Sequence, residues 1–155
     1  MDLQALYQDI ILDHYKNPRG RGLLDSSLGS ASHVNPTCGD EVTVQLDLDA
    51  DGGLVIGYEG QGCSISQASA SVMVELLSGL AMPEAEGIRL AFVDLMHSQG
   101  RAEPDEEVLG DAVAFVGVAK YPARIKCALL PWMALQDAGI KGGISTDARE
   151  EDRSR

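Results

Sequence analysis

The chain has 155 residues, of which 45% are hydrophobic, so it is long enough for one domain with its own core. Its 24 acidic and 12 basic residues give a formal charge of -12, which argues against nucleic acid or anionic membrane as a general partner, since both select for lysine and arginine. No apolar run approaches the roughly 20 residues that span a bilayer, and the N-terminus lacks the pattern of a signal peptide. Three cysteines cannot all pair internally and are too few for a secreted disulfide scaffold, so we expect reduced thiols and a cytoplasmic location.

The N-terminal part of the chain predicts one helix and one hairpin. Apolar residues recur at helical spacing from Leu3 onward and the pattern stops at Pro18, which indicates an amphipathic helix. A connection rich in glycine, serine and arginine follows over residues 19–32. Residues 42–59 alternate apolar and polar side chains on both sides of Asp51-Gly52-Gly53, which predicts an antiparallel hairpin.

A helix is expected directly after Cys63. Ser64 or Ser66 can cap it, and apolar residues at helical spacing continue up to Gly79. Cys63 then lies near a helix N-terminus, where the amide groups and the helix dipole favour a thiolate. Because Cys38 precedes the hairpin and Cys63 follows it, both thiols are expected at one end of the sheet.

Three further helices are predicted in the rest of the chain. Helical patterns cover residues 84–97 and, more briefly, residues 108–113, and a last helix begins around Pro122. Pro131 within this helix removes the hydrogen bond to the carbonyl of Cys127, so we expect a bend or an irregular first turn at that cysteine.

Each of the three cysteines lies in a polar or glycine-rich setting. Glycine stands next to Cys38 and Cys63, and the cations Arg124 and Lys126 precede Cys127. A thiol that only fills a core usually sits in an apolar run, whereas glycine lets a ligand approach closely. These settings indicate a metal site with sulfur chemistry, and the alternative is a set of buried structural thiols. The two cations either support that site or are solvated surface residues.

A zinc site would need one more ligand than the cysteines supply. Zinc prefers four ligands and takes thiolate, imidazole or carboxylate. Asp40 is the candidate, because Gly39 permits a tight turn that lets Cys38 and Asp40 converge on one ion. The alternative is that this carboxylate only caps a turn.

Four stretches of the chain resemble the U-type iron–sulfur cluster assembly proteins, the family of IscU, SufU and the N-terminal part of NifU. The similarity extends over about residues 3–138, with the matching positions in the same order. The stretches are Tyr7-Gln8-Asp9-Ile10-Ile11-Leu12-Asp13-His14-Tyr15-Lys16-Asn17-Pro18, Asn35-Pro36-Thr37-Cys38-Gly39-Asp40, Gly60-Gln61-Gly62-Cys63-Ser64-Ile65-Ser66-Gln67-Ala68-Ser69 and Arg124-Ile125-Lys126-Cys127-Ala128-Leu129-Leu130.

Within this family the chain is more similar to the SufU branch than to the IscU scaffold branch. IscU-type proteins have a histidine directly before the third cysteine and a Leu-Pro-Pro-Val-Lys segment that a chaperone recognises. Here Lys126 and residues 121–125 take those places. The 64 positions from Cys63 to Cys127 (127 minus 63) exceed the IscU spacing and fit a SufU insertion within residues 80–118.

The resemblance implies a zinc site with a defined set of ligands. The matching positions are Cys38, Asp40, Cys63 and Cys127. Zinc is the expected cofactor, with iron or an iron–sulfur cluster as the alternative. We hypothesise that Cys38 is the catalytic sulfur acceptor, because it lies on a glycine-flanked loop and not on a helix, while Asp40 keeps the ion bound. Arg124 and Lys126 are expected to offset part of the negative charge of the ligands.

The resemblance also implies partners and leaves three functions open. A cysteine desulfurase of SufS type would donate persulfide sulfur, which passes on to the downstream iron–sulfur assembly machinery. The leading function is therefore a zinc-dependent sulfur acceptor, or sulfurtransferase. The runner-up is a scaffold on which a cluster is built directly, and a weaker third is an adaptor that only docks the desulfurase. Thiolates bind iron as well as zinc, so the ligands alone do not separate the first two.

The fold implied by the resemblance is α+β, with a small antiparallel three-stranded sheet, helices packed on one face and the metal site at one end. Residues 1–140 are expected to form a single IscU/SufU-like domain, since no internal repeat or second domain is visible. Residues 141–155 are first glycine-rich and then charged, so we expect a disordered tail.

Overall fold

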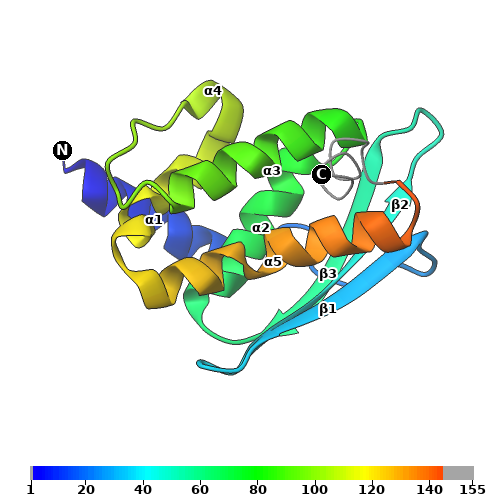
Figure 1. The fold of residues 1–155 in the computed structure, drawn as a ribbon, viewed down its shortest axis with the longest axis horizontal. Helices are drawn as coiled ribbons and strands as arrows, with labels where there is room; N and C mark the ends of the chain where they lie inside the picture. Colours follow the sequence, from blue (N-terminus) through cyan, green and yellow to red (C-terminus); the bar gives the residue numbers. More distant parts are fainter. Residues whose placement is uncertain (1, 145–155) are drawn as a thin grey trace, which may run out of the picture.

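The computed structural model describes residues 2–144, which form a three-stranded sheet with helices packed on one face (Figure 1). α5 crosses β1 and β2, and α2 packs between α5 and α1. The elements in chain order are α1 (Leu3–Lys16), β1 (Gly29–Asn35), β2 (Asp40–Leu48), β3 (Leu54–Gln61), α2 (Ser64–Leu77), α3 (Met82–Met96), α4 (Glu106–Leu109), the 3₁₀ helix η1 (Gly110–Lys120) and α5 (Pro122–Lys141). The expected α+β class and antiparallel sheet are confirmed.

The sheet is antiparallel throughout, in the order β1-β2-β3. The predicted hairpin over residues 42–59 is confirmed as β2 and β3. The sequence interpretation of residues 19–32 as a connection is wrong at its end, because β1 already begins at Gly29. This strand consists largely of small and polar residues, so it lacks the apolar alternation of the other two. Tertiary contacts stabilise it instead, because it pairs with β2 and packs against α5.

Close packing at the start of β1 depends on glycine. A Cβ atom at Gly29 would lie 2.0 Å from the carbonyl oxygen of Ala138 and 2.8 Å from the amide nitrogen of Gly142. The missing side chain therefore lets the strand approach the C-terminal end of α5 at backbone distance. That contact holds β1, and the loop after it, under the last helix.

The predicted helices are present, with three corrections. Cys63 itself is the N-cap of α2, while the hydroxyl of Ser66 donates to the Cys63 carbonyl at 3.1 Å, so neither serine caps the helix. The short helix expected over residues 108–113 is α4 followed by η1, which together span residues 106–120. α5 runs uninterrupted through Pro131, and no irregular turn occurs at Cys127 within this helix. Packing along the sheet stabilises α5 despite the lost hydrogen bond.

The C-terminal boundary lies slightly later than the sequence suggests. Lys141 still belongs to α5, and the amide of Gly142 donates to the carbonyl of Ala138 at 2.9 Å. The rest of the predicted tail, residues 145–155, lies outside the described residues. No helix in the described part of the chain is long and apolar enough to cross a membrane.

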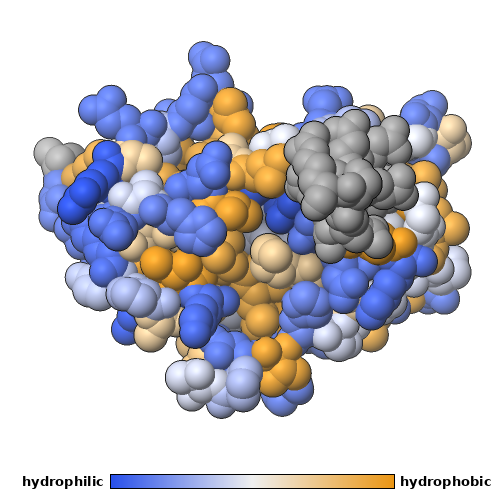
Figure 2. Space-filling view, viewed as in Figure 1, coloured by the Kyte–Doolittle hydropathy of each residue, from blue (hydrophilic) through white to orange (hydrophobic). Residues whose placement is uncertain are grey.

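A buried histidine anchors α1 to the rest of the domain. His14 is the only fully buried residue of α1, and its ring nitrogens lie 2.8 Å from the hydroxyl of Ser71 and 2.8 Å from a carboxylate oxygen of Asp111. Several apolar residues of this helix remain exposed, among them Leu3 and Leu12. Hydrophobic side chains also reach the surface over α3 and α5, where Leu90 and Met133 are exposed (Figure 2).

Contacts between α2 and α5 position two of the cysteines. The indole of Trp132 is fully buried, stacks on Phe92 with ring centroids 4.5 Å apart, and donates to the hydroxyl of Ser69 at 2.9 Å. That hydroxyl in turn donates to the carbonyl of Ala128 at 2.6 Å. Since Cys63 begins α2 and Cys127 precedes Ala128, this clamp sets the separation of the two thiols.

Replacing the hydroxyl of this clamp should destabilise the fold. Ser69→Ala leaves the buried indole N–H of Trp132 without an acceptor, which costs about 1–3 kcal/mol of unfolding free energy. Chemical denaturation of the variant measures the loss. Ser78→Ala is the control, because its hydroxyl bonds only the Val74 carbonyl of its own helix end, at 2.6 Å. Equal stability of the two variants would contradict the clamp.

Candidate metal centre

Four segments bring the predicted ligands to one end of the sheet. Cys38 lies in the four-residue connection between β1 and β2, and Asp40 is the first residue of β2. Cys63 is the N-cap of α2. Cys127 lies in the second turn of α5. Their convergence therefore requires the β1–β2 turn, the β3–α2 junction and the α2–α5 contact at once.

The four side chains meet around one carboxylate oxygen. Oδ2 of Asp40 lies 3.2 Å from Sγ of Cys38 and 3.3 Å from Sγ of Cys63. The sulfur atoms of Cys38 and Cys127 are 3.3 Å apart. The donor atoms of Cys38, Asp40 and Cys127 all lie within 4.8 Å of one another. The structure thus brings Cys38, Asp40 and Cys127 into one group, while Cys63 lies outside that group and approaches it through the carboxylate of Asp40.

The three thiols differ in their access to solvent. All are free cysteines; Cys38 is exposed, Cys63 is half-buried and Cys127 is buried. Asp40 is fully buried below them. A macromolecular partner can therefore reach the sulfur of Cys38 first.

Asp40 is held in place by the junction between β3 and α2. Its Oδ1 accepts a hydrogen bond from the backbone amide of Cys63 at 2.7 Å, which leaves Oδ2 facing the thiols. A Cβ atom at Gly62, whose φ is +143°, would lie 2.1 Å from Oδ1. Burial acts to raise the pKa of this carboxyl, but the bonds from the Cys63 amide and the thiols outweigh it and hold the pKa below its ordinary value. The carboxylate is therefore anionic at neutral pH.

The same surroundings act in the opposite direction on Cys127. Burial, followed by the neighbouring Asp40 and Cys38, raises the pKa of the Cys127 thiol well above its ordinary value. An anionic carboxylate amid three thiols favours a bound cation, which would offset the charge that opposes ionisation. The cluster is thus suited to a cation and poorly suited to free thiolates.

The donor set fits a tetrahedral zinc ion. Three sulfur atoms and one carboxylate oxygen complete four-fold coordination. With Zn–S bonds of about 2.3 Å, two sulfur ligands in a tetrahedron lie about 3.8 Å apart. The sulfur atoms of Cys38 and Cys127, 3.3 Å apart, are close to this distance. Cys63 is not within 4.8 Å of all the other donors, so its side chain would have to turn toward the ion to complete the site.

The two cations proposed to support the site do not touch it. Arg124 and Lys126 are both exposed, and among residues 2–144 neither forms a hydrogen bond or ion pair with the four clustered groups. Their role in offsetting ligand charge stays a prediction that depends on longer-range electrostatics.

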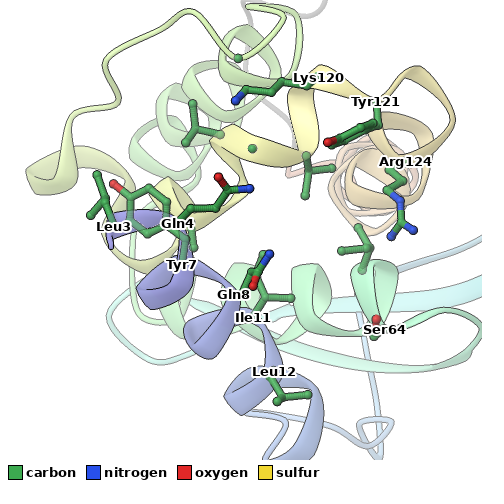
Figure 3. A pocket seen from close by; sticks show the side chains of 16 residues that line it. Leu3, Gln4, Tyr7, Gln8, Ile11, Leu12, Ser64, Lys120, Tyr121 and Arg124 are labelled. Atoms are coloured by element: carbon green, nitrogen blue, oxygen red, sulfur yellow. The ribbon is translucent and has the colours of Figure 1, made fainter. Parts of the chain in front are cut away.

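A groove opens beside the metal centre and has a cavity volume of about 950 Å³. Tyr7 and Ile11 of α1 form one wall, and Lys120 and Arg124 extend from the opposite side (Figure 3). Ser64, which directly follows the second cysteine, lines it as well. The groove therefore runs from an apolar helix face to the residue that follows Cys63, although none of the clustered thiols lines it.

Sequence reasoning missed Asn35, the last residue of β1. This residue is buried, and its side-chain amide nitrogen lies 3.9 Å from Sγ of Cys127. An asparagine directly before a proline is typical of a turn, so the sequence signal pointed to local structure only. Asn35 and Cys127 are 92 positions apart in the sequence, so no local pattern predicts their contact.

A second cluster of possible metal ligands lies where α1, α2 and η1 meet, and it already contains a cation. His14, Glu75 and Asp111 place donor atoms within 4.8 Å of one another. Nε of Arg19 lies 3.0 Å from the carboxylate of Glu75, so a cation already stands beside the group. This arrangement is a structural ion-pair network.

Comparison with known proteins agrees with this fold. The family description of the NifU-like N-terminal domain matches residues 6–128. A zinc-dependent sulfurtransferase SufU of Bacillus subtilis is 45% identical over 140 residues, covering 90% of this chain and 93% of the relative. An iron–sulfur cluster assembly scaffold protein IscU of Streptococcus pyogenes is 38% identical over 136 residues, covering 88% of this chain and 84% of the relative.

Solved structures share the architecture. The N-terminal part of a nitrogen-fixing NifU-like protein from Brucella abortus superposes with a TM-score of 0.78 at 27% identity, covering 91% of this chain and 96% of that one. A candidate iron–sulfur assembly scaffold protein of the SUF system from Fervidobacterium islandicum gives a TM-score of 0.73 at 35% identity, with 88% and 98% covered. The chain belongs to the NifU-like N-terminal domain family, and within it resembles both SufU and IscU proteins.

Filling the space at Gly62 should disturb the cation site. Gly62→Ala forces the new Cβ against the Asp40 carboxylate, so we expect the affinity for added Zn²⁺ or Co²⁺ to fall about 10- to 100-fold. Competition with a chromophoric chelator measures the affinity. Gly87→Ala in α3, where a Cβ meets nothing within 4 Å, is the control. Unchanged affinity in Gly62→Ala would show that the placement of Asp40 does not matter.

Proposed function

We propose that this protein is a zinc-dependent sulfur acceptor that takes persulfide sulfur from a cysteine desulfurase of SufS type for iron–sulfur cluster assembly. The observation that carries the proposal is the exposed thiol of Cys38, 3.2 Å from Asp40 and 3.3 Å from Cys127 in a cluster of three thiols and one carboxylate. The similarity to a zinc-dependent sulfurtransferase supports it. Free thiols of this kind persist in a reducing compartment, so the proposal includes the cytoplasm as its location.

The four clustered residues would hold the zinc ion. When bound, redox-inert zinc keeps thiolates available at neutral pH without oxidising them. Three thiolates and one carboxylate around a dication sum to a charge of about -2. Arg124 and Lys126, exposed on the first turns of α5, would offset part of that charge through solvent.

Sulfur transfer at Cys38 is a thiol exchange that needs no external oxidant or reductant. The thiolate of Cys38 attacks the terminal sulfur of the donor persulfide, and a new S–S bond forms between them. The S–S bond of the donor breaks, and its electron pair leaves with the donor cysteine as thiolate. The terminal sulfur, with its proton, is then carried as a persulfide on Cys38. From here it passes to the downstream assembly machinery.

The groove beside the site is the proposed approach of the desulfurase. Its apolar wall on α1 offers exposed hydrophobic surface, which suits a protein partner. Lys120 and Arg124 at its edge have no ion-pair partner among residues 2–144, although the chain carries 24 acidic residues. Unpaired cations on an acidic protein favour a partner segment that carries carboxylates.

Loss of the exposed thiol should abolish sulfur acceptance. In Cys38→Ser, stimulation of desulfurase turnover should disappear because a hydroxyl does not attack a persulfide at neutral pH, while binding to the desulfurase stays within a few-fold. Alanine release and isothermal titration measure the two effects. Thr37→Ala, on the same loop, is the control and should retain stimulation. An adaptor would predict that Cys38→Ser still stimulates turnover, and that result refutes the assignment.

A scaffold that builds the cluster on the same ligands is the second candidate, favoured by the relatives that carry the IscU scaffold name. Metal analysis of protein purified without added iron separates the two. Stoichiometric zinc without a visible chromophore supports sulfur acceptance, whereas a brown cluster that resists chelation supports the scaffold.

Reversing the charges at the groove should weaken binding to the desulfurase. The double change Lys120→Glu with Arg124→Glu should reduce affinity about tenfold or more at low salt, with the difference shrinking as ionic strength rises. Titration at two salt concentrations measures it. Lys141→Glu alters charge at the far end of α5, about 25 Å from Arg124, and serves as the control. If the groove variant and the control bind alike, the desulfurase approaches elsewhere.

A further inference from the structure

Asn35 joins the loop of the exposed thiol to the buried thiol. It ends β1 directly opposite Asp40, and it is only 7% exposed. Its carbonyl accepts a hydrogen bond from the amide of Gly39 at 2.8 Å, and its Oδ1 accepts one from the amide of Thr37 at 3.2 Å. Both bonds shape the turn that carries Cys38. One residue therefore supports the loop on which the reactive sulfur is exposed.

The orientation of the Asn35 side chain follows from these bonds. An amide carries its acceptor and its donors on opposite sides, and only the oxygen can accept from the amide of Thr37. The NH₂ group must then face the other way, where Nδ2 lies 3.9 Å from Sγ of Cys127. An N–H donor thus points at the buried sulfur.

The other two thiols have no comparable donor among residues 2–144. The partners of Cys38 Sγ are the carboxylate of Asp40 and the sulfur of Cys127. Cys63 lies 4.0 Å from the hydroxyl of Ser66, whose proton is already donated to the Cys63 carbonyl. The hydrogen bonding of the cluster is therefore asymmetric, with the N–H donor directed at one sulfur only.

We propose that Asn35 is a positioning residue that selects which thiolate reacts, by weakening the nucleophilicity of Cys127 and building the turn that exposes Cys38. A hydrogen bond to a thiolate withdraws electron density from sulfur, so the bonded thiolate attacks more slowly and remains a ligand. Cys38 receives no such N–H bond among residues 2–144 and is exposed. The inference rests on the proposed function, because only a sulfur acceptor needs one reactive thiolate among three.

Site-resolved alkylation tests the selection without any desulfurase, so its failure is distinguishable from failure of the proposed function. Zinc-loaded protein is treated briefly with iodoacetamide, and mass spectrometry of its peptides gives the label at each cysteine. Asn35→Asp and Asn35→Ser both keep an acceptor for the turn and remove the N–H donor. Only Asn35→Asp adds a negative charge. Because the lost hydrogen bond is made to a charged sulfur, the ratio of label at Cys127 to label at Cys38 should rise roughly tenfold in both variants.

The control is a substitution on the same strand, β1. Ser32→Ala removes a hydroxyl of β1 that lies 2.6 Å from the hydroxyl of Thr43 and touches no sulfur, so its labelling should match the wild type. An unchanged ratio in both Asn35 variants would overturn the proposal. So would a rise in Asn35→Asp alone, since added charge and not the lost donor would then be the cause.

A measurement on the unmodified chain covers the case in which the variants fail to fold. In wild-type protein loaded with cadmium, hydrogen–cadmium correlation NMR detects protons that are coupled to the metal through a bonded sulfur. We expect a correlation from the Asn35 side-chain amide protons in addition to those from the cysteine β-protons. Correlations confined to the cysteine protons would overturn the proposal.

Discussion

The hydrogen bond from the backbone amide of Cys63 to the carboxylate of Asp40 is the contact on which the metal centre depends. At 2.7 Å it joins the start of β2 to the start of α2 and turns the second carboxylate oxygen toward the thiols. Gly62 leaves the space for this approach. The bond gives the buried carboxylate a fixed direction and, ahead of the three thiols, opposes the effect of burial and lowers its pKa. The rest of the site is arranged around that one oxygen.

The three thiols lie at one end of the sheet but differ in the elements that carry them and in their exposure. Cys127 belongs to a long helix that packs in the core, and Cys63 caps a second helix, whereas Cys38 lies on a short turn. Rigid elements thus carry the thiols suited to remain as ligands, and the turn carries the thiol suited to react. Such a division lets one sulfur accept a group while the others and Asp40 preserve the site.

The charge of the chain is distributed unevenly around the site. A protein with a formal charge of -12 repels acidic surfaces in general, yet Lys120, Arg124 and Lys126 gather at the start of α5. Lys120 and Arg124 line the groove, so under the proposed function an acidic partner segment would be drawn to this end of the molecule. Electrostatics of this kind acts mainly on the rate and orientation of encounter.

Local patterns in the sequence determined α1, the β2–β3 hairpin, the main helices and the residue types of a thiol–carboxylate site, because helical and strand periodicities are properties of neighbouring residues. Motif resemblance added the third strand, which the serine-rich residues of β1 do not reveal by alternation. Only the tertiary structure decided that Cys63 caps α2, that Pro131 leaves α5 unbroken, and that Asn35 faces Cys127 across 92 positions. Such contacts depend on strand register and helix packing, which join segments distant in the chain and leave no periodic trace within either one.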